Sequence, residues 1–306
     1  MQAFHSDRFQ PDLPPGHRFP MAKYRMLREA VAQQLPEVRL AEAPSVPIPA
    51  LCLAHDETYV AAALQGELSA AHQREIGFPW SAALMERSIR AVGATVAATE
   101  AARHEGVAIN LAGGTHHASA EHGSGFCVFN DVAVAIRLAQ QQGWVRRALV
   151  VDLDVHQGNG TAAIFAGDAD VFTLSLHGDK NFPFRKAPST LDVPLPDGCD
   201  DATYLQALDE ALAVAAAAHA KAPFDVLFYL AGADVHEGDR LGRLALSAEG
   251  MRARDESVMR LGEAWGLPLV MAMAGGYGRD IPALLEVQLR TVETALGAWR
   301  RRRTHQ

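Results

Sequence analysis

ALVVDLDVH, residues 148–156, joins a short apolar run to two aspartates and one histidine. Such an apolar run, bounded by polar residues, is typical of a strand covered on both faces, as in parallel sheets. Because extended backbone sends alternate side chains to the same side, Asp152, Asp154 and His156 can point one way. A carboxylate and an imidazole two residues apart can hold one divalent metal ion. The stretch therefore predicts a buried strand that leads into a metal site.

The same pattern recurs along the chain, where apolar runs alternate with longer helical stretches. The predicted strands are 107–111, 148–153, 171–176, 226–231 and 269–274. The five predicted helices follow Ser81, Asp131, Asp201, Ser247 and Pro282. The first four end at Gly106, at Gly143, before Pro223 and near Gly266. This alternation predicts an α/β fold with an open, doubly wound parallel sheet flanked by helices. Since no repeat or linker-like stretch interrupts it, we expect residues 1–306 to form a single domain.

Composition narrows the class of function. Lys and Arg total 28 against 36 Asp and Glu, and the resulting net charge of −8 disfavours general binding to nucleic acid. The one basic run, residues 299–303, is interpreted as a solvated helix end. Three cysteines without a CxxC pair fit a reducing compartment, and the sequence shows neither a signal peptide nor a bilayer-spanning run. We therefore expect a cytoplasmic protein that binds neither nucleic acid nor membrane.

Polar clusters follow four of the predicted strands. In open parallel sheets, sites form in the crevice beyond the carboxyl ends of the strands. Four strand ends that bring reactive side chains to one crevice are hard to obtain by accident. In chain order, the clusters are His116-His117 after 107–111, Asp154 and His156 after 148–153, Asp234 after 226–231, and Gly275-Gly276-Tyr277 after 269–274.

Asp154, His156 and Asp234 are the candidate metal ligands. One histidine and two carboxylates leave a zinc ion an open position for water and substrate, as a catalytic site requires. Taken singly, Asp154 and His156 are more readily interpreted as loop residues that cap the next helix. The aspartate that follows a second strand, Asp234, favours the metal site.

His116 and His117 are the candidate acid–base pair, because a neutral imidazole accepts a proton and an imidazolium returns one. The alternative is two buried histidines bonded to the backbone. A working histidine needs a partner for its second ring nitrogen, and the candidates are Asp152 for His116 and Asn159 for His117. A neutral amide does not raise the pKa of an imidazole as a carboxylate does. His117 is therefore expected to be neutral at rest and to act as the general base.

Tyr277 is the candidate donor to a carbonyl oxygen that becomes an oxyanion during attack. A tyrosine packed at a turn is the alternative, because Gly-Gly-Tyr alone is a weak signal. Asp239 and Arg240 are expected to pair locally and to shape the mouth of the site, and an ordinary surface turn is the alternative.

Aromatic residues supply a candidate channel for the methylenes of a lysine-like substrate. Ordinary core packing is the alternative for each phenylalanine. The candidate channel residues are Gly125, Phe126, Phe182 and Phe184.

Together these segments resemble the zinc-dependent histone deacetylase family, which has the arginase-deacetylase fold. The matching segments occur in the family's order and cover most of the chain: 113–118 (GGTHHA), 125–127 (GFC), 152–160 (DLDVHQGNG), 175–177 (SLH), 232–234 (GAD) and 275–277 (GGY). The segments HQGNG at 156–160 and EGDRLG at 237–242 resemble the corresponding segments of class IV and its bacterial relatives. Residues 16–21 and 77–81 resemble the bacterial members too.

The resemblance implies two metal sites and three catalytic residues. The zinc ligands would be Asp154, His156 and Asp234. The catalytic residues would be His117 as general base and acid, His116 as its electrostatic partner, and Tyr277 as oxyanion donor. A structural potassium ion would bind the backbone carbonyls of Asp152, Asp154, His156 and Leu176 and the hydroxyl of Ser175. The family's loop aspartate that clamps the substrate backbone is not placed in this sequence.

The activity implied is an amidohydrolase that removes acyl groups from the lysine side chains of peptides or proteins. An acetylated polyamine or another small acyl-amine is the nearest alternative substrate. A ureohydrolase with two manganese ions would need further ligands, for which Asp152 is a candidate. A non-catalytic acyl-lysine binder would be expected to lack a ligand, the base or Tyr277, all of which are present. The class IV resemblance suggests long acyl chains, by analogy, while the physiological substrate and the oligomeric state stay open.

Overall fold

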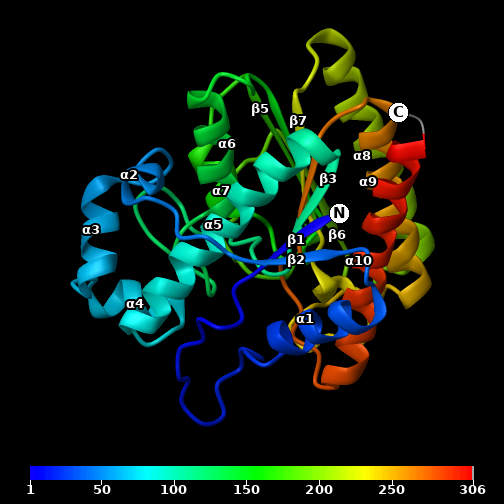
Figure 1. Ribbon diagram of the computed structural model, residues 1–306. Coiled ribbons are helices and arrows are strands. Elements are labelled where there is room, and N and C mark those ends of the chain that lie inside the picture. Colours follow the sequence, from blue (N-terminus) through cyan, green and yellow to red (C-terminus); the bar gives the residue numbers. More distant parts are fainter. Residues whose placement is uncertain (305–306) are drawn as a thin grey trace.

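The computed structural model describes residues 1–304. Eight parallel strands form one sheet at the centre of the molecule (Figure 1). Their order across the sheet is β2-β1-β3-β8-β7-β4-β5-β6. The strands are β1 (Gln2–His5), β2 (Arg39–Glu42), β3 (Val107–Asn110), β4 (Ala148–Asp152), β5 (Val171–Gly178), β6 (Leu191–Leu195), β7 (Val226–Leu230) and β8 (Leu269–Ala272). The predicted α/β fold with a parallel sheet is confirmed.

Helices cover both faces of the sheet (Figure 1). One face carries α1 (Lys23–Gln34), α8 (Asp201–Lys221), α9 (Ala248–Ala264) and α10 (Ile281–Thr304). The other carries α2 (Ile48–Leu51), α3 (Glu57–Gln65), α4 (Ala70–Ile76), α5 (Ala82–Glu105), α6 (Asp131–Gln141) and α7 (Asn159–Ile164). A short 3-10 helix, η1 (Ala233–Val235), follows β7.

The five predicted strands and the five predicted helices are all present, and side chains fix where the helices begin. Ser81, Asn130, Asp200 and Ser247 each accept a hydrogen bond from a backbone N–H in the first turn of α5, α6, α8 and α9. These bonds satisfy donors that the first turn of a helix leaves unpaired. Glycine ends α5 at Gly106, as its position in the sequence predicts.

Three strands and the smaller helices were not predicted. β1 and β2 have four residues each, and β2 is a partly exposed edge strand. β6 forms the opposite edge and contains Pro194, which an edge strand tolerates because one side of its backbone is free of the ladder. Edge strands lack the continuous apolar pattern that identifies the central ones.

Alternate residues of each central strand supply two hydrophobic cores, one on each face of the sheet. In β3, Val107 and Ile109 pack toward α1 and α10, while Ala108 packs toward α5 and α6. The basic run 299–303 lies in α10, where Arg300 and Arg301 pair with glutamates. Among residues 1–304, no helix combines the length and apolar character that crossing a bilayer requires.

Arg254 in α9 is a fully buried guanidinium that ties this helix to the ends of two central strands. Its Nη1 donates to the carbonyl oxygen of Gly232 at 2.6 Å and to that of Leu153 at 3.3 Å. Its Nε and Nη2 both donate to Oδ1 of Asp255, at 2.9 and 2.7 Å. The ion pair therefore stabilises the segments that directly follow β4 and β7 through hydrogen bonds to their backbone.

Replacing Arg254 with methionine is expected to lower the free energy of unfolding by about 3–5 kcal/mol, because Asp255 would stay buried without its cation. The double variant Arg254→Met/Asp255→Asn removes that stranded charge and should recover part of the loss. Urea denaturation of both variants and of the unmodified protein measures the difference. A single variant as stable as the unmodified protein would contradict the assignment.

Candidate active site

The predicted site residues lie in loops at the carboxyl ends of four neighbouring strands, β3, β8, β7 and β4. In that order, the strands are followed by His116-His117, by Tyr277, by Asp234, and by Asp154 with His156. Parallel strands end at the same edge of a sheet, so the four loops meet in one crevice.

Asp154, His156 and Asp234 form a buried cluster in which one ligand atom of each lies within 4.8 Å of the others. Nδ1 of His156 lies 2.9 Å from Oδ1 of Asp154 and 3.2 Å from Oδ2 of Asp234. The N–H of Gly275 donates to the second oxygen of Asp154 at 2.7 Å, and the N–H of Val155 donates to Oδ1 of Asp234 at 3.0 Å. Within the described part of the chain, Oδ2 of Asp234 accepts no hydrogen bond.

Two buried carboxylates side by side repel each other and require a cation. Burial and then the charge of Asp154 raise the pKa of Asp234 to about 7. Burial opposes ionisation of His156, but the two carboxylates beside it raise its pKa to about 10. In the metal-free protein the proton on His156 therefore supplies the positive charge. The cluster offers two carboxylates and one imidazole nitrogen, and one of the carboxylate oxygens accepts no hydrogen bond within the described chain. This ligand set fits zinc, which would replace the proton on His156.

His116 and His117 differ in the charge of the group behind each ring. Nδ1 of His116 lies 2.7 Å from Oδ2 of Asp152, and Nδ1 of His117 lies 2.7 Å from Oδ1 of Asn159. Burial disfavours a charged imidazole, but the carboxylate of Asp152 raises the pKa of His116 to about 9. For His117, burial and the charges of the neighbouring histidines lower the pKa well below its usual value. The pair therefore holds one charged and one neutral ring, with centroids 4.2 Å apart.

The loop that carries the two histidines is bound to Asp131 at the start of α6. The Asp131 carboxylate accepts hydrogen bonds from the N–H groups of Gly114 and Thr115, at 3.0 and 2.7 Å, and from the Thr115 hydroxyl at 2.7 Å. Gly114 has φ of +68°, and a Cβ there would lie 2.5 Å from Cβ of Ala274. Glycine thus lets the histidine loop touch the loop that carries Tyr277. The sequence identifies Asp131 only as a helix start, and its full burial carries no local signal.

Tyr277 lines the same cavity as His117 and His156, and its ring centroid lies 6.2 Å from that of His156. Burial, and then the charges of Asp154 and Asp234, raise the pKa of the Tyr277 hydroxyl well above its usual value. The hydroxyl therefore keeps its proton and remains a hydrogen-bond donor.

Asp239 and Arg240 were expected to pair with each other, and that prediction is wrong. Oδ2 of Asp239 accepts a hydrogen bond from the N–H of Tyr277 at 2.5 Å, while Arg240 donates to the carbonyl oxygen of Arg18. Backbone groups compete for each side chain, which a reading of adjacent residues cannot anticipate.

A cavity of about 770 Å³ extends from the protein surface to His117, His156 and Tyr277. The four predicted channel residues line it: Gly125, Phe126, Phe182 and Phe184. The ring of Phe182 meets that of His117 edge to face, with centroids 4.9 Å apart. Phe184 is 87% exposed, so it contributes an apolar surface to the outer part of the cavity.

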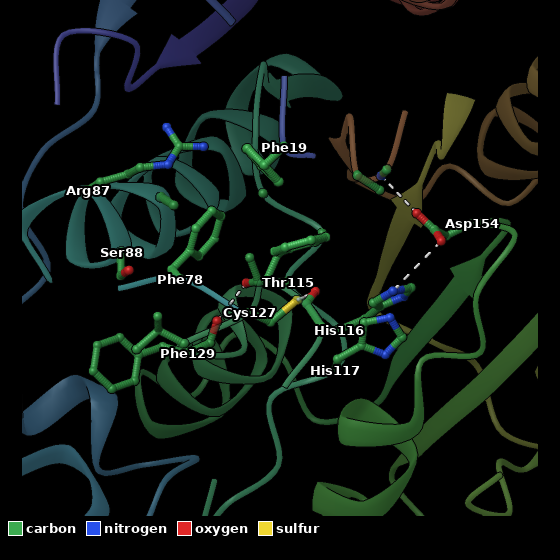
Figure 2. Close-up of a pocket in the computed structure, with 18 of the residues that line it drawn as sticks. Phe19, Phe78, Arg87, Ser88, Thr115, His116, His117, Cys127, Phe129 and Asp154 are labelled. Carbon is green, nitrogen blue, oxygen red and sulfur yellow. Dashed lines mark hydrogen bonds and ion pairs between the residues drawn. The ribbon is translucent and has the colours of Figure 1, made fainter. Parts of the chain in front are cut away.

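A second, more enclosed cavity of about 60 Å³, called the inner cavity below, is also lined by His117, His156 and Tyr277 (Figure 2). His116, His117 and Asp154 lie on one side of it, and Phe19 and Arg87 lie on the other. Nη1 of Arg87 is buried and has no hydrogen-bond partner among the described residues. This cavity was not predicted, because its walls come from α5, the segment before α1 and the loop after β3, which are far apart in the sequence.

The groups of the predicted potassium site lie at the end of β4, in the loop that follows it, and in β5. In the register of β4 and β5, Asp152 is the partner of Ser175, and Leu176 follows in β5. All five residues are buried. The Ser175 hydroxyl lies 3.0 Å from Nδ1 of His177.

Comparison with known sequences finds a match to the histone deacetylase domain over residues 17–289. An uncharacterized protein of Picosynechococcus sp. is 44% identical over 92% of this chain and 93% of its own length. Histone deacetylase 2 of Arabidopsis thaliana is 39% identical over 61% of this chain, and acetylpolyamine amidohydrolase 2 of Pseudomonas aeruginosa is 32% identical over 53%. The aligned part spans 48% of each of these last two proteins.

Solved structures show the same architecture. The crystal structure of an HDAC homolog from Aquifex aeolicus has a TM-score of 0.79 at 25% sequence identity. The match covers 96% of this chain and 83% of that one.

The metal-free protein is expected to lose stability as the pH rises from about 6.5 to about 10. Folding raises the pKa of His116 from 6.5 to about 9 and that of His156 to about 10. The folded state then keeps protons that the unfolded state releases, so this stabilisation is complete below pH 6.5 and lost as the pH rises through the raised values.

Melting temperatures in the presence of a chelator measure this loss. The variant Asp152→Asn, which removes the carboxylate behind His116, should show a smaller decrease. A melting temperature that rises over the same pH interval would contradict the charge assignments.

Proposed function

Because the chain belongs to the histone deacetylase family, we propose that it is a zinc-dependent amidohydrolase that removes acyl groups, acetyl or longer, from lysine side chains of peptides or proteins. The buried Asp–His–Asp cluster, the histidine pair of unequal charge and the protonated tyrosine each contribute one side chain to the same cavity, namely His156, His117 and Tyr277, and this convergence supports the proposal. A protein that only binds acyl-lysine would not need this complete set.

Asp154, His156 and Asp234 would hold the zinc ion. Zinc, when bound, would polarise the amide carbonyl and lower the pKa of a water molecule beside it. A ureohydrolase with two metal ions is less favoured, because the candidate extra ligand is already engaged. Asp152 accepts from Nδ1–H of His116 through one oxygen and from the N–H of Asp154 through the other.

His117 would act as the general base. Its Nδ1–H is used in the bond to Asn159, so Nε2 carries the lone pair that accepts a proton from the attacking water. The positive charge of His116, maintained by Asp152, would stabilise the negative charge that develops beside it. A histidine of the pair would then give a proton to the departing amine nitrogen.

Tyr277 would donate a hydrogen bond to the carbonyl oxygen as that oxygen becomes negative. The raised pKa of its hydroxyl means that the proton is present when it is needed. A donor fixed in a water-poor site is worth more than one in solution, because it does not reorganise during the reaction.

The charge of the cavity mouth favours a lysine peptide over a polyamine as the substrate. Four exposed cationic residues line the cavity: Arg18, Arg74, Lys180 and Arg243. Glu75 is the one carboxylate that lines it within the described chain, and Asp197 lies 3.7 and 3.4 Å from two of the cations. The cavity mouth therefore carries an excess of positive charge, although the whole chain has a net charge of −8. A polyamine carries several positive charges and would be repelled, whereas a neutral or acidic peptide would not.

Finer parts of the proposal rest on the family resemblance. They are membership of class IV, a preference for long acyl chains, and a structural potassium ion at the carbonyls of Asp152, Asp154, His156 and Leu176 with the Ser175 hydroxyl. We also propose that the chain forms a single catalytic domain, since one sheet carries every site residue. Three free cysteines are consistent with a cytoplasmic location.

Tyr277→Phe is expected to lower kcat by roughly 10²–10³, the usual effect of removing one oxyanion donor, and to change KM little. His117→Ala should retain zinc and lose nearly all turnover, because the base does not bind the metal in this assignment. Steady-state kinetics on an acetyl-lysine peptide, with zinc content measured on the same samples, tests both. An unchanged kcat for Tyr277→Phe, or loss of zinc from His117→Ala, would contradict the assigned roles.

Arg74→Glu is expected to raise kcat/KM several-fold for an acyl-lysine peptide with basic flanking residues and to lower it for one with acidic flanks, with both effects weaker in high salt. Arg260→Glu is the matched control, because it makes the same charge change away from the cavity. Arg260 lies near the C-terminal end of α9, the helix that precedes β8. Higher kcat/KM for acetylated polyamines than for any peptide in the unmodified protein would refute the substrate class.

A further inference from the structure

We infer that Lys23 and Asp239 are positioning residues that hold the peptide unit between Gly276 and Tyr277 at both ends, and so fix the direction of the Tyr277 hydroxyl. The catalytic consequence of this inference rests on the proposed function. Lys23 is the first residue of α1, and Asp239 lies in the loop after η1.

The loop before Tyr277 has a backbone conformation that most residues avoid. Ala274 has φ of +51° and Gly276 has φ of +150°. A Cβ on Gly275 would lie 1.9 Å from Oδ2 of Asp234, so the loop passes directly over a carboxylate of the candidate metal site. For a non-glycine residue such as Ala274, a positive φ costs about 1–3 kcal/mol and persists only where the surroundings hold it, whereas Gly276 adopts its positive φ freely. The Tyr277 loop therefore depends on contacts from outside itself.

Lys23 supplies one of these contacts. Its side chain is 1% exposed, and its Nζ donates to the carbonyl oxygen of Gly276 at 3.0 Å. Nζ also lies 5.0, 5.3 and 5.7 Å from the ring centroids of Tyr24, Tyr277 and Phe19, which is within the range of cation–π attraction. Burial of an amine is costly unless it is well paired. This amine contacts both the peptide that precedes Tyr277 and the Tyr277 ring.

Asp239 supplies the contact at the other end of the same peptide unit. Its Oδ2 accepts from the N–H of Tyr277 at 2.5 Å. Its Oδ1 accepts from the N–H groups of Leu241 and Gly242 at 2.7 and 2.9 Å, which anchors the carboxylate in its own loop. The carbonyl and the N–H of one peptide unit are thus bound by side chains that are 253 and 38 residues away.

The direction of the Tyr277 side chain follows the orientation of this peptide unit, and the hydroxyl lies at the far end of the side chain. A small rotation of the backbone therefore becomes a larger displacement of the donor. A misplacement of about 1 Å can cost about 10²-fold in rate. Lys23 and Asp239 do not touch the reacting atoms in this mechanism, and the effect inferred for them on the rate passes through Tyr277.

A double-mutant cycle tests this dependence. Lys23→Met and Asp239→Asn are each made alone and together with Tyr277→Phe, and the zinc-loaded proteins are assayed on an acetyl-lysine peptide. Each single variant should lower kcat by about 10- to 100-fold and leave KM within about twofold. In the Tyr277→Phe background the same substitution should change kcat by less than about twofold, because the hydroxyl that it positions is gone.

Arg302→Met is the matched control. Arg302 is also a cation that donates to backbone carbonyls, those of Gly106 and Leu267, but these lie where β3 and β8 begin, at the opposite edge of the sheet. This variant should lower the melting temperature and leave kcat unchanged.

A spectroscopic measurement on the metal-free protein gives a readout that does not depend on activity. The chain has five tyrosines, so labelling with 3-fluorotyrosine gives five fluorine resonances, and Tyr277→Phe identifies the one from Tyr277. Lys23→Met and Asp239→Asn should shift or broaden that resonance. Arg302→Met should not, and the resonances of the core residues Tyr204 and Tyr229 should stay in place in all variants.

Two results would overturn the inference: equal losses of kcat with and without the Tyr277 hydroxyl, or a Tyr277 resonance that neither variant moves. A different result would contradict the proposed function instead, namely no turnover of any acyl-lysine peptide by the unmodified zinc-loaded protein. In that case the fluorine spectra still decide whether Lys23 and Asp239 hold Tyr277.

Discussion

The repulsion between two buried carboxylates governs the site and much of its surroundings. Asp154 and Asp234 follow neighbouring strands, β4 and β7, and neither can turn toward solvent because both are buried. Donors and cations converge on them: the N–H groups of Val155 and Gly275, and the imidazole of His156. Even so, one oxygen of Asp234 receives no hydrogen bond within the described chain. An unpaired buried charge is costly to any fold, so the stability of this crevice and its affinity for a divalent cation have the same origin.

The same principle separates the two adjacent histidines. Both are histidines and they are adjacent in the chain, but Nδ1 of His116 is bonded to a carboxylate and Nδ1 of His117 to an amide oxygen. Burial favours the neutral form of both, and only Asp152 supplies enough negative charge to reverse that preference. The acid–base assignment is therefore set by the last residue of β4, Asp152, and the first residue of α7, Asn159. A change at Asp152 or Asn159 would alter the chemistry without removing either imidazole.

The sequence predicted the central strands and the polar residues at their ends well, because both signals are local. A strand buried on both faces must be continuously apolar, and a catalytic side chain at its end stands out against that run. The edge strands β2 and β6 were missed because their partial exposure interrupts the continuous apolar pattern. Pro194 also makes β6 less typical of a strand. Lys23, Arg254 and the inner cavity were missed for another reason. Their roles arise from contacts between segments that are up to about 250 residues apart, and no local pattern encodes such a contact.

The position of β8 has a consequence for the order in which the molecule can assemble. β8 is the last strand in the sequence, yet it lies in the middle of the sheet, between β3 and β7. Before it is synthesised, β1, β2 and β3 can form one half-sheet and β4 to β7 another, but no strand ladder joins the two halves. The histidine pair belongs to the first half, and the Asp–His–Asp cluster to the second. A nascent chain on the ribosome therefore holds the parts of its site on two unjoined bodies until Leu269–Ala272 emerges and closes the sheet between them.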